Sequence, residues 1–590
     1  MMTLLLLAAL LWPLCAAGNV VWQAYQTPSA RRNYFPLVWL TASWPALLLA
    51  YGGEAHWSIE AWMLGGEWGL NAISRPWLAF TALLWSVAAV HGRGYFVAEQ
   101  AKAQAGDQDA ERRLLRLALF WPLTFVGNVL LIIAQDIASF YLGFALMTFA
   151  AYALVVHSGS QQARLGARAY LILAVIGEGL ILGGLLWAAG TAETLMLEGV
   201  REGIAAADHG AIMALLLWLG FGVKAGVIGL HVWLPLAHPV APAPASAVLS
   251  GAMIKAGLLG WLYVLPLGAE GLSPGLILLG NVMLTAGIAA AFGAALFGVW
   301  QRHPKAVLAY SSISQMGMLT AMVAMGLAAP AVWPLLLPGV ILFAAHHALA
   351  KGALFMGTSI SDHMPRWPKP LLFALIALPG VSLTGALAAG MISKWGVKHA
   401  LYEMDHTYLI MLLTWAAIGT ATLVSVCVWR QWQQCQQGGS NAFQWGAWLV
   451  ALIAALITPL WLPLPEGSIV PPPLTEWLGI VWPFPVGVLL FVSVAYWLRK
   501  VGGKAPPAGD LWWLYSPLAA RSVKVAQVIG ARCKAVKGAC VNVALAVEQH
   551  SMGQLTRLLS SETWMRHHGS GLMMAFAVVV ALLLIWEGMR

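Results

Sequence analysis

Apolar stretches long enough to cross a lipid bilayer recur along almost the whole chain. A transmembrane helix needs roughly 20 predominantly apolar residues. The 590-residue chain is 60% hydrophobic and only 9% charged, whereas soluble domains carry about 25% charged residues. Because lipid offers no hydrogen-bond partner to an open backbone, such stretches form helices that satisfy their own backbone groups. We therefore predict an all-α polytopic membrane protein.

The apolar lengths predict about sixteen transmembrane helices. We expect them near residues 2–17, 36–52, 76–91, 115–134, 137–156, 169–190, 211–236, 245–267, 275–299, 305–327, 333–357, 371–397, 407–429, 442–463, 477–498 and 571–588. The first segment resembles a signal peptide with a small-residue end. It lacks a basic region in front, so we interpret it as a transmembrane helix.

Basic residues alternate between successive loops. Odd-numbered loops hold most of them, such as Arg31, Arg32, Arg112 and Arg113, and even-numbered loops hold mainly acids such as Glu198. The positive-inside rule then places the odd loops in the cytoplasm and both termini on the opposite side. We expect a multi-pass protein of a bacterial-type inner membrane. The net charge of +9 is attributed to these loops and not to nucleic-acid binding.

The sequence shows no pattern typical of a cofactor site. Its five cysteines have neither CxxC nor Cys/His ligand spacing, so we expect no disulfide framework, zinc site or iron–sulfur cluster. Walker A loops, dinucleotide fingerprints and nucleophile elbows are also missing from the sequence. We expect no cofactor in this chain and no redox centre of its own.

The last long loop has an amphipathic character. Between Ser516 and Arg566, apolar residues recur at partly helical spacing, with basic residues between them. This pattern favours an amphipathic helix lying laterally on the cytoplasmic face in contact with lipid. A basic tail attracted to anionic lipid is the alternative.

Ionisable residues interrupt several apolar segments. A charge at mid-membrane costs at least about 2.5–3.5 kcal/mol, so each is a functional candidate. They are Glu178, Lys224, His231, Lys255, His346, His347, Lys351 and Lys394. For Lys394, near the end of its apolar run, an alternative is extension of the amine to the interface. The histidines alone could be hydrogen-bonded core residues.

As a set, these residues predict a polar chain through the bundle. His347 and Lys351 are four residues apart and share a helix face, a spacing that suits a proton relay. Burial disfavours the charged form of lysine and of glutamate, and a neighbouring opposite charge reverses this effect. A buried lysine with a carboxylate partner is therefore a proton switch, which proton translocation requires.

Prolines interrupt the segment "WLPLAHPVAPAPASA", which contains Pro235, His238, Pro239 and Pro242. Proline lacks the N–H donor, and irregular backbone at membrane depth is tolerated only where it is buried in protein or lines a cavity. Broken helices mark ion sites in transporters. We expect helix breaks here and around Pro379 in "LPGVSLTGALAAG". A tight loop between two helices explains part of the first run equally well.

Several of these segments resemble the antiporter-like subunits of the respiratory complex I superfamily. The segments are "HVWLPLAHPVAPAPASAVLSGAMIKAGLLG", "HPKAVLAYSSISQMGML", "HHALAKGALF" and "GMISKWG". Together they are highly specific, and the strong resemblance covers residues 115–400. The context "MIKAGLLG" around Lys255 and the length are most similar to the branch of hydrogenase-4 component B and formate hydrogenlyase subunit 3.

The resemblance implies a fold with two inverted five-helix repeats and discontinuous helices seven and twelve. The implied division is 1–114 for helices one to three, 115–267 and 268–430 for the repeats, 431–499 for helices fourteen and fifteen, 500–569 for the lateral helix, and 570–590 for the last span.

It also implies roles for single residues. Lys224 would lie at the input half-channel and Lys255 at the centre. His347 and Lys351 would continue the axis, and Lys394 would serve the output half.

One position departs from the family pattern. The family carries a glutamate in helix five that pairs with the helix-seven lysine, whereas this chain has Ala145 within "GFALMTF". Glu178 on helix six is our candidate for a relocated partner of Lys224. Without such a partner the lysine lacks its switch.

Three functions remain open at this level. The first is a non-catalytic proton-translocating subunit of a redox-driven complex, with other membrane subunits and iron–sulfur redox subunits as partners. The second is an ion transporter, or a subunit that energises inorganic-carbon uptake, without a redox partner. The third is a degenerate scaffold, which Ala145 favours and the row of lysines disfavours.

Overall fold

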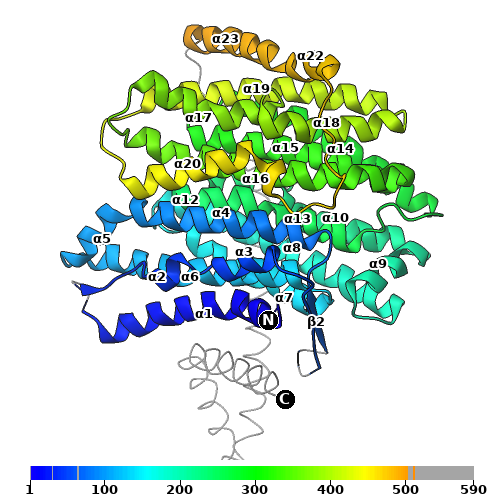
Figure 1. The fold of residues 1–590 in the computed structure, drawn as a ribbon, viewed down its shortest axis with the longest axis horizontal. Helices are drawn as coiled ribbons and strands as arrows, with labels where there is room; N and C mark the ends of the chain where they lie inside the picture. Colours follow the sequence, from blue (N-terminus) through cyan, green and yellow to red (C-terminus); the bar gives the residue numbers. More distant parts are fainter. Residues whose placement is uncertain are drawn as a thin grey trace, which may run out of the picture. The chain divides into compact units, whose positions relative to one another are not determined.

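The computed structural model describes residues 2–28, 31–60, 62, 65–501, 509 and 511. These residues form a bundle of helices with one small β-hairpin (Figure 1). The predicted lateral helix from Ser516 to Arg566 and the predicted span at 571–588 lie outside the described residues.

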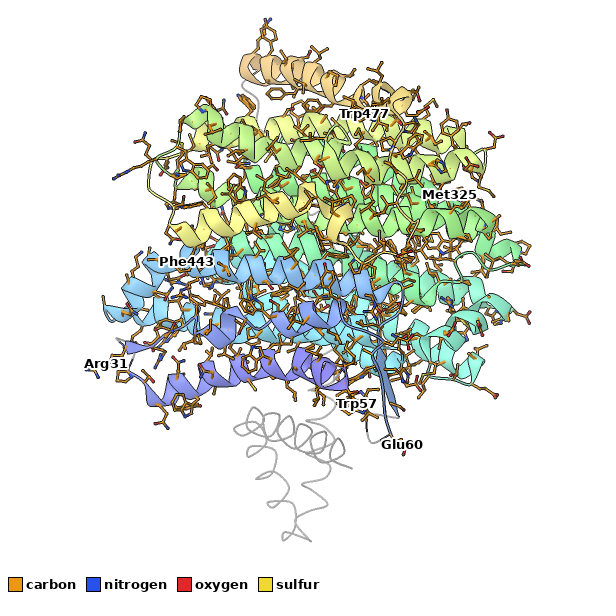
Figure 2. All side chains as sticks on the ribbon, in the orientation of Figure 1. Arg31, Trp57, Glu60, Met325, Phe443 and Trp477 are labelled. Atoms are coloured by element: carbon orange, nitrogen blue, oxygen red, sulfur yellow. The ribbon has the colours of Figure 1, made fainter. Side chains whose placement is uncertain are left out.

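The N-terminal part contains six helices. They are α1 (Met2–Gln26), α2 (Leu37–Leu40), α3 (Trp44–Ala50), α4 (Ser74–Tyr95), α5 (Val97–Gln104) and α6 (Gln108–Ile133). The second predicted loop, between the spans at 36–52 and 76–91, contains the hairpin, which our all-α prediction missed. Its strands β1 (His56–Ile59) and β2 (Gly66–Gly69) pair antiparallel, with Trp57 opposite Trp68. Figure 2 labels Trp57 and Glu60 at this hairpin.

The next part contains the first interrupted helix. Its elements are α7 (Ile137–Val155), α8 (Gln161–Ala192), α9 (Leu197–Ala206), α10 (Gly210–Ala225), α11 (Trp233–Ala237), α12 (Ala243–Val248), the π-helical turn η2 (Leu249–Met253) and α13 (Ile254–Val264).

The second interrupted helix follows, with the C-terminal helices after it. The elements are α14 (Pro274–Gly298), α15 (Pro304–Ala328), the 3₁₀ turn η3 (Pro330–Val332), α16 (Trp333–Asp362), α17 (Lys369–Thr384), α18 (Ala388–Glu403), α19 (Thr407–Gln434), α20 (Ala442–Leu456), α21 (Thr458–Trp461), the 3₁₀ turn η4 (Leu474–Glu476), α22 (Trp477–Val481) and α23 (Pro483–Val501).

Eleven helices of the described residues are long and apolar enough to cross a membrane, and three shorter apolar helices accompany them. Each predicted span up to residue 498 coincides with a helix or a pair of helices. The membrane class is therefore confirmed, whereas the count of about sixteen spans stays a prediction.

Local signals explain where many helices begin and how closely they pack. Asp107, Asp136 and Ser160 accept hydrogen bonds from backbone amides in the first turns of α6, α7 and α8, as N-cap residues do. A Cβ added to Gly127 would lie 2.3 Å from the Met147 amide nitrogen. Glycine here lets the backbones of α6 and α7 touch, as small residues do between membrane helices.

The most deeply buried spans are the run Ala243–Val264 and α15, whose apolar windows are wholly covered by other helices. Figure 1 shows them in the middle of the bundle, between α1 at one edge and α23 at the other. Polar groups on these central helices are therefore shielded from lipid on every side.

A cluster of charged side chains links α5, α6 and the residues just after α7. Glu99 of α5 accepts from Arg113 Nε of α6 at 2.5 Å and lies 3.0 Å from His157 Nε2, just after α7. Burial raises the pKa of the Glu99 carboxyl, but hydrogen bonding and charge from His157 and then Arg113 outweigh burial. The pKa of Glu99 therefore lies below its usual 4.5.

We predict that Glu99→Gln destabilises the protein by about 1–3 kcal/mol at neutral pH, because it weakens hydrogen bonds to two half-buried partners. A lowered folded-state pKa means that the stabilisation is present above the unfolded-state pKa near 4.5. It is lost as the pH falls through the folded-state value. Thermal unfolding in detergent across this range measures the effect.

The matched control is Asp109→Asn, which removes the exposed 3.9 Å pair with Arg112 on α6. An exposed pair contributes little, so its melting temperature should match that of the unmodified protein. Equal melting temperatures for Glu99→Gln and the unmodified protein at pH 7 would contradict the assignment.

Candidate functional site

Lys224 lies at the end of α10, directly before an interruption of the helix. Gly226 has φ +80° and Gly229 has φ +86°, a left-handed conformation that glycine adopts without a steric penalty. Trp233 of α11 donates from Nε1 to the Val223 carbonyl at 2.8 Å, which fixes the far side of the interruption against α10. The interruption thus leaves the last turn of α10, with Lys224, at a fixed place inside the bundle.

The Lys224 amine is held by an aromatic hydroxyl. Its Nζ donates to the Tyr170 hydroxyl at 2.8 Å, and that hydroxyl donates to the Thr148 carbonyl at 2.7 Å. Nζ also lies 4.9 Å from the centre of the Tyr170 ring. Both side chains are almost fully buried. The group that accepts a hydrogen bond from the Lys224 amine is therefore a neutral hydroxyl and not a carboxylate.

Glu178 shares one small cavity with Lys224. The cavity measures about 10 Å³ and is lined by both residues together with Tyr170, Thr148 and Trp233. This volume is about that of one water molecule. Neither carboxylate oxygen of Glu178 has a hydrogen-bond partner, and the two charges lie within electrostatic range of each other. The structure thus places the predicted partner of Lys224 on the wall of the same cavity, which has room for one water molecule between the two side chains.

Ala145, by contrast, lies outside this cavity. Its neighbours Phe144 and Thr148 on α7 line the cavity, while Ala145 is itself half-exposed. Glu178 therefore approaches Lys224 from the α8 side of the cavity, and not from α7, where Ala145 lies.

Lys255 and His347 form the centre of the site. Lys255 Nζ lies 2.5 Å from His347 Nδ1 and donates to the Ser250 carbonyl at 2.8 Å. Ser250 belongs to the π-helical turn η2, and π-turns of this kind are frequent at functional sites. Lys255 and His347 are fully buried, and His347 Nε2 has no hydrogen-bond partner.

Two serines connect this centre to Lys351. The Ser250 hydroxyl lies 2.7 Å from that of Ser312, and Ser312 donates to the Leu308 carbonyl at 3.0 Å. Lys351 Nζ donates to the same carbonyl at 3.0 Å. Since Ser312 spends its only hydrogen on Leu308, Ser250 donates to Ser312. Polar groups of Ser250, Ser312 and Leu308 therefore line the space between the two buried lysines, although Lys255 contacts the Ser250 carbonyl and not its hydroxyl.

His346 points to a different place from its neighbour His347. Its Nε2 lies 2.8 Å from the Ser382 hydroxyl, which itself donates to the Leu387 carbonyl at 3.0 Å. Because the hydroxyl hydrogen is used there, Nε2 of His346 donates. Ser382 and Leu387 flank the interruption between α17 and α18, where Gly385 has φ +92°. His346 thus fastens α16 to the second broken helix.

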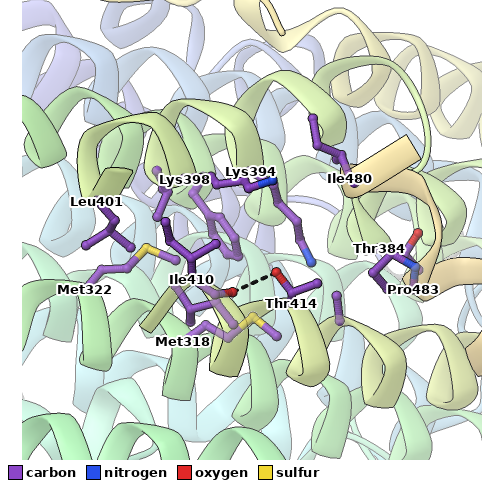
Figure 3. Close-up of a pocket in the computed structure, with 15 residues that line it drawn as sticks. Met318, Met322, Thr384, Lys394, Lys398, Leu401, Ile410, Thr414, Ile480 and Pro483 are labelled. Carbon is purple, nitrogen blue, oxygen red and sulfur yellow. Dashed lines mark hydrogen bonds between the residues drawn. The ribbon is translucent and has the colours of Figure 1, made fainter. Parts of the chain in front are cut away.

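Lys394 lies on α18, one to two turns beyond this interruption. Its Nζ is buried without a hydrogen-bond partner and lies within electrostatic range of His346. It lines a cavity of about 50 Å³ with Thr384 and Lys398 (Figure 3). The Nζ atom is enclosed by the bundle, while the side chain as a whole is only partly buried.

The helix is interrupted twice in this region. The first break spans residues 226–232, before the prolines, because glycines end α10. The second break, at 238–242 between α11 and α12, contains His238, Pro239 and Pro242, as the sequence predicts. Pro235 does not break its helix, because it lies in the first turn of α11, where the missing N–H has no partner to lose.

The break predicted around Pro379 is present within the segment "LPGVSLTGALAAG", but it lies beyond Pro379 itself. Pro379 is inside α17, and the helix continues to Thr384. The positive φ at Gly385 ends it.

The remaining predicted histidines are buried near the centre. His238 stacks on Phe355 with a ring-centre distance of 4.6 Å and lies within electrostatic range of Lys255, Lys305 and Lys351. His231 is buried in the first interruption.

Sequence reasoning missed Tyr170, Ser250, Ser312 and Lys305. Only Lys305 had a usable signal, since it follows "HP" at the start of an apolar run. Its Nζ donates to the Ala241 carbonyl at 2.8 Å.

The polar residues succeed one another across the bundle. Figure 1 shows α8 toward the α1 edge of the bundle, α10 and α13 at one level beyond it, and α16 and then α18 farther toward α23. A row that crosses parallel membrane helices lies along the membrane plane and not across it. Lys255, His347 and Lys351 thus bring three ionisable side chains together in the interior of the bundle.

Comparison with known proteins agrees with this picture. Residues 134–420 match the family model described as NADH:quinone oxidoreductase/Mrp antiporter, transmembrane. Hydrogenase-4 component B of Escherichia coli (strain K12) is 26% identical over 316 residues, which cover 50% of this chain and 46% of that protein. Na(+)/H(+) antiporter subunit A1 of Staphylococcus haemolyticus (strain JCSC1435) is 29% identical over 317 residues, covering 50% and 39%.

A solved structure shares the fold. The Mrp complex from Dietzia sp. DQ12-45-1b superposes with a TM-score of 0.66 at 20% identity, covering 92% of this chain and 62% of the matched chain. The chain spans about half the length of the curated relatives named above. The first of these relatives is named as a component and the second as a subunit. Residues 134–420 therefore carry the transmembrane domain of the NADH:quinone oxidoreductase/Mrp antiporter family, and the chain is similar to the antiporter-like membrane subunits of the complex I superfamily.

Proposed function

We propose that this chain is the proton-translocating subunit of a redox-driven membrane complex related to complex I or to membrane-bound hydrogenases. The single observation that carries the proposal is the fully buried group of Lys255, His347 and Lys351, in which Lys255 contacts His347 and both amines donate only to neutral carbonyls. Buried lysines that contact only neutral groups can gain and lose protons without breaking an ion pair. The redox centres would lie in separate iron–sulfur subunits.

The path has an input side and an output side. A proton enters at Glu178 and Lys224, passes Lys255, His347 and Lys351, and leaves from Lys394. The two interrupted helices, α10–α11 and α17–α18, lie at its two ends. We assign them to the inverted repeats that the family resemblance implies, with both termini on the non-cytoplasmic side.

A second function is favoured by one specific observation. The 29% identity to a Na(+)/H(+) antiporter subunit fits a chain that exchanges ions without a redox partner. The same row of residues would then move protons against a cation. Scaffolding alone is disfavoured, because a scaffold has no need for lysines buried without counter-charges.

Partner identification separates these functions. The tagged chain is extracted from its native membrane in mild detergent, and the copurified subunits are identified by mass spectrometry. Iron–sulfur subunits in stoichiometric amounts support the redox-driven complex. A set that contains only other antiporter-type membrane subunits refutes it in favour of the ion exchanger.

We predict that Lys224→Ala lowers proton translocation at least about tenfold while the assembly remains intact. The change removes the only amine of the Glu178 cavity and leaves the Tyr170 hydroxyl bonded to Thr148. Acidification of membrane vesicles during turnover, followed with a pH-sensitive dye, measures the effect. Lys102→Ala, at an exposed lysine of α5, is the matched control and should translocate normally.

Unchanged translocation by the assembled Lys224→Ala complex would remove Lys224 from the path. A loss accompanied by missing subunits would show an assembly defect, which native gel electrophoresis of the same vesicles detects.

We also predict that Glu178→Gln reduces translocation to the level of Lys224→Ala, and that the double variant is no worse than either single variant. Two residues that act as one switch give such non-additive effects. The same vesicle assay measures all three. Normal translocation by Glu178→Gln, or multiplied losses in the double variant, would contradict a relocated partner on α8.

A further inference from the structure

The cavity beside Lys394 combines a mostly apolar wall with two lysine side chains. Most of it is apolar side chains of α15, α16 and α19, and two amines enter it from one face of α18, those of Lys394 and Lys398 (Figure 3). At about 50 Å³ it has room for roughly four water molecules. The remaining wall is Gly479, Ile480 and Pro483, which come from the C-terminal helices and not from the matched family domain.

An ion pair joins that wall to α18. Lys398 Nζ lies 3.1 Å from Glu476 Oε2, with 18% and 35% of the two side chains exposed. The backbone of α22 rests on the pair, because a Cβ added to Gly479 would lie 3.4 Å from Lys398 Nζ and 3.7 Å from Glu476 Oε2.

The two partners differ in how they are held. Lys398 is flanked by the rings of Trp395 and Tyr402, at 5.9 and 5.7 Å from its amine, and belongs to a helix packed in the bundle. Glu476 ends a single 3₁₀ turn, and α22 after it has only five residues. Three prolines at 471–473 precede this turn, so it has few backbone hydrogen bonds to a neighbour. The carboxylate side of the pair is therefore the side that can move.

We propose that α22 is a lid over the Lys394 cavity and that the Lys398–Glu476 ion pair latches it. The inference rests on the proposed function in one respect, namely that Lys394 is the last residue to hold the proton. A proton leaves the Lys394 ammonium for a cavity water, which regenerates the neutral amine. It reaches the non-cytoplasmic side when the pair opens. An ion pair this exposed is weak, which suits a latch that opens in each cycle.

Accessibility of the cavity tests the lid without depending on proton transport. Ala417 lines the cavity and is 2% exposed, so Ala417→Cys places a thiol inside it. The other cysteines of the full chain are replaced by serine. A membrane-impermeant thiol reagent is added to right-side-out vesicles that contain the assembled complex, and the labelling rate is measured.

Glu476→Gln in this background is expected to raise the labelling rate roughly two- to fivefold, the range that follows from losing a partly exposed ion pair. The charge exchange Lys398→Glu with Glu476→Lys rebuilds the pair and should return the rate to its starting value. Glu198→Gln is the matched control, since it removes the exposed 3.4 Å pair with Arg201 on α9. It should leave the rate unchanged.

Three results would contradict the lid proposal. The first is an unchanged labelling rate for Glu476→Gln, and the second is an equal increase for Glu198→Gln. The third is a labelling rate that stays raised in the double variant with the exchanged charges. A different measurement tests the proposed function: normal proton translocation by Lys394→Ala would contradict it. That result would not change the labelling rates, so the two proposals can fail separately.

Discussion

The burial of lysine in an apolar bundle is the constraint on which the rest of the structure depends. Lys255 and Lys351 are fully buried, and the partners that hold them are carbonyls and an imidazole. Such neutral partners soften the desolvation cost of a charge without fixing it in place. The central helices must therefore be covered on every side, which α12, α13 and α15 are. They must also offer free carbonyls, which the π-helical turn beside Lys255 supplies.

The two helix interruptions lie at the two ends of the row of buried ionisable residues, near Lys224 and Lys394. Glycines at 226 and 385 end α10 and α17 inside the bundle, and each interruption lies within two or three turns of a buried lysine. Their polar backbone is satisfied by neighbours. Ser382 alone contacts Leu387, Gly390 and His346. Small cavities border Lys224 and Lys394, while between them Ser250 and Ser312 lie close to the central lysines.

Much of this was predictable because it depends on strong local signals. Apolar length predicted the spans, and the cost of membrane charge singled out Lys224, Lys255 and Lys351. The partners were not predictable, because Tyr170 and Ser312 are ordinary residues whose roles depend on tertiary neighbours. The break in the segment around Pro379 was predictable, but its exact position was not, since proline weakens a helix without always ending it. A positive φ, which only the fold reveals, ended the helix instead.

The central claim is that the buried lysines carry protons, and Lys255 tests it most directly because it lies at the middle of the row. The measurement is the proton flux per turnover of the assembled complex in sealed vesicles, with Lys255→Gln against the unmodified chain. Glutamine keeps a polar side chain of similar length but cannot hold the transferred proton. The account predicts a loss of at least about tenfold with all subunits present. A normal flux per turnover would contradict it.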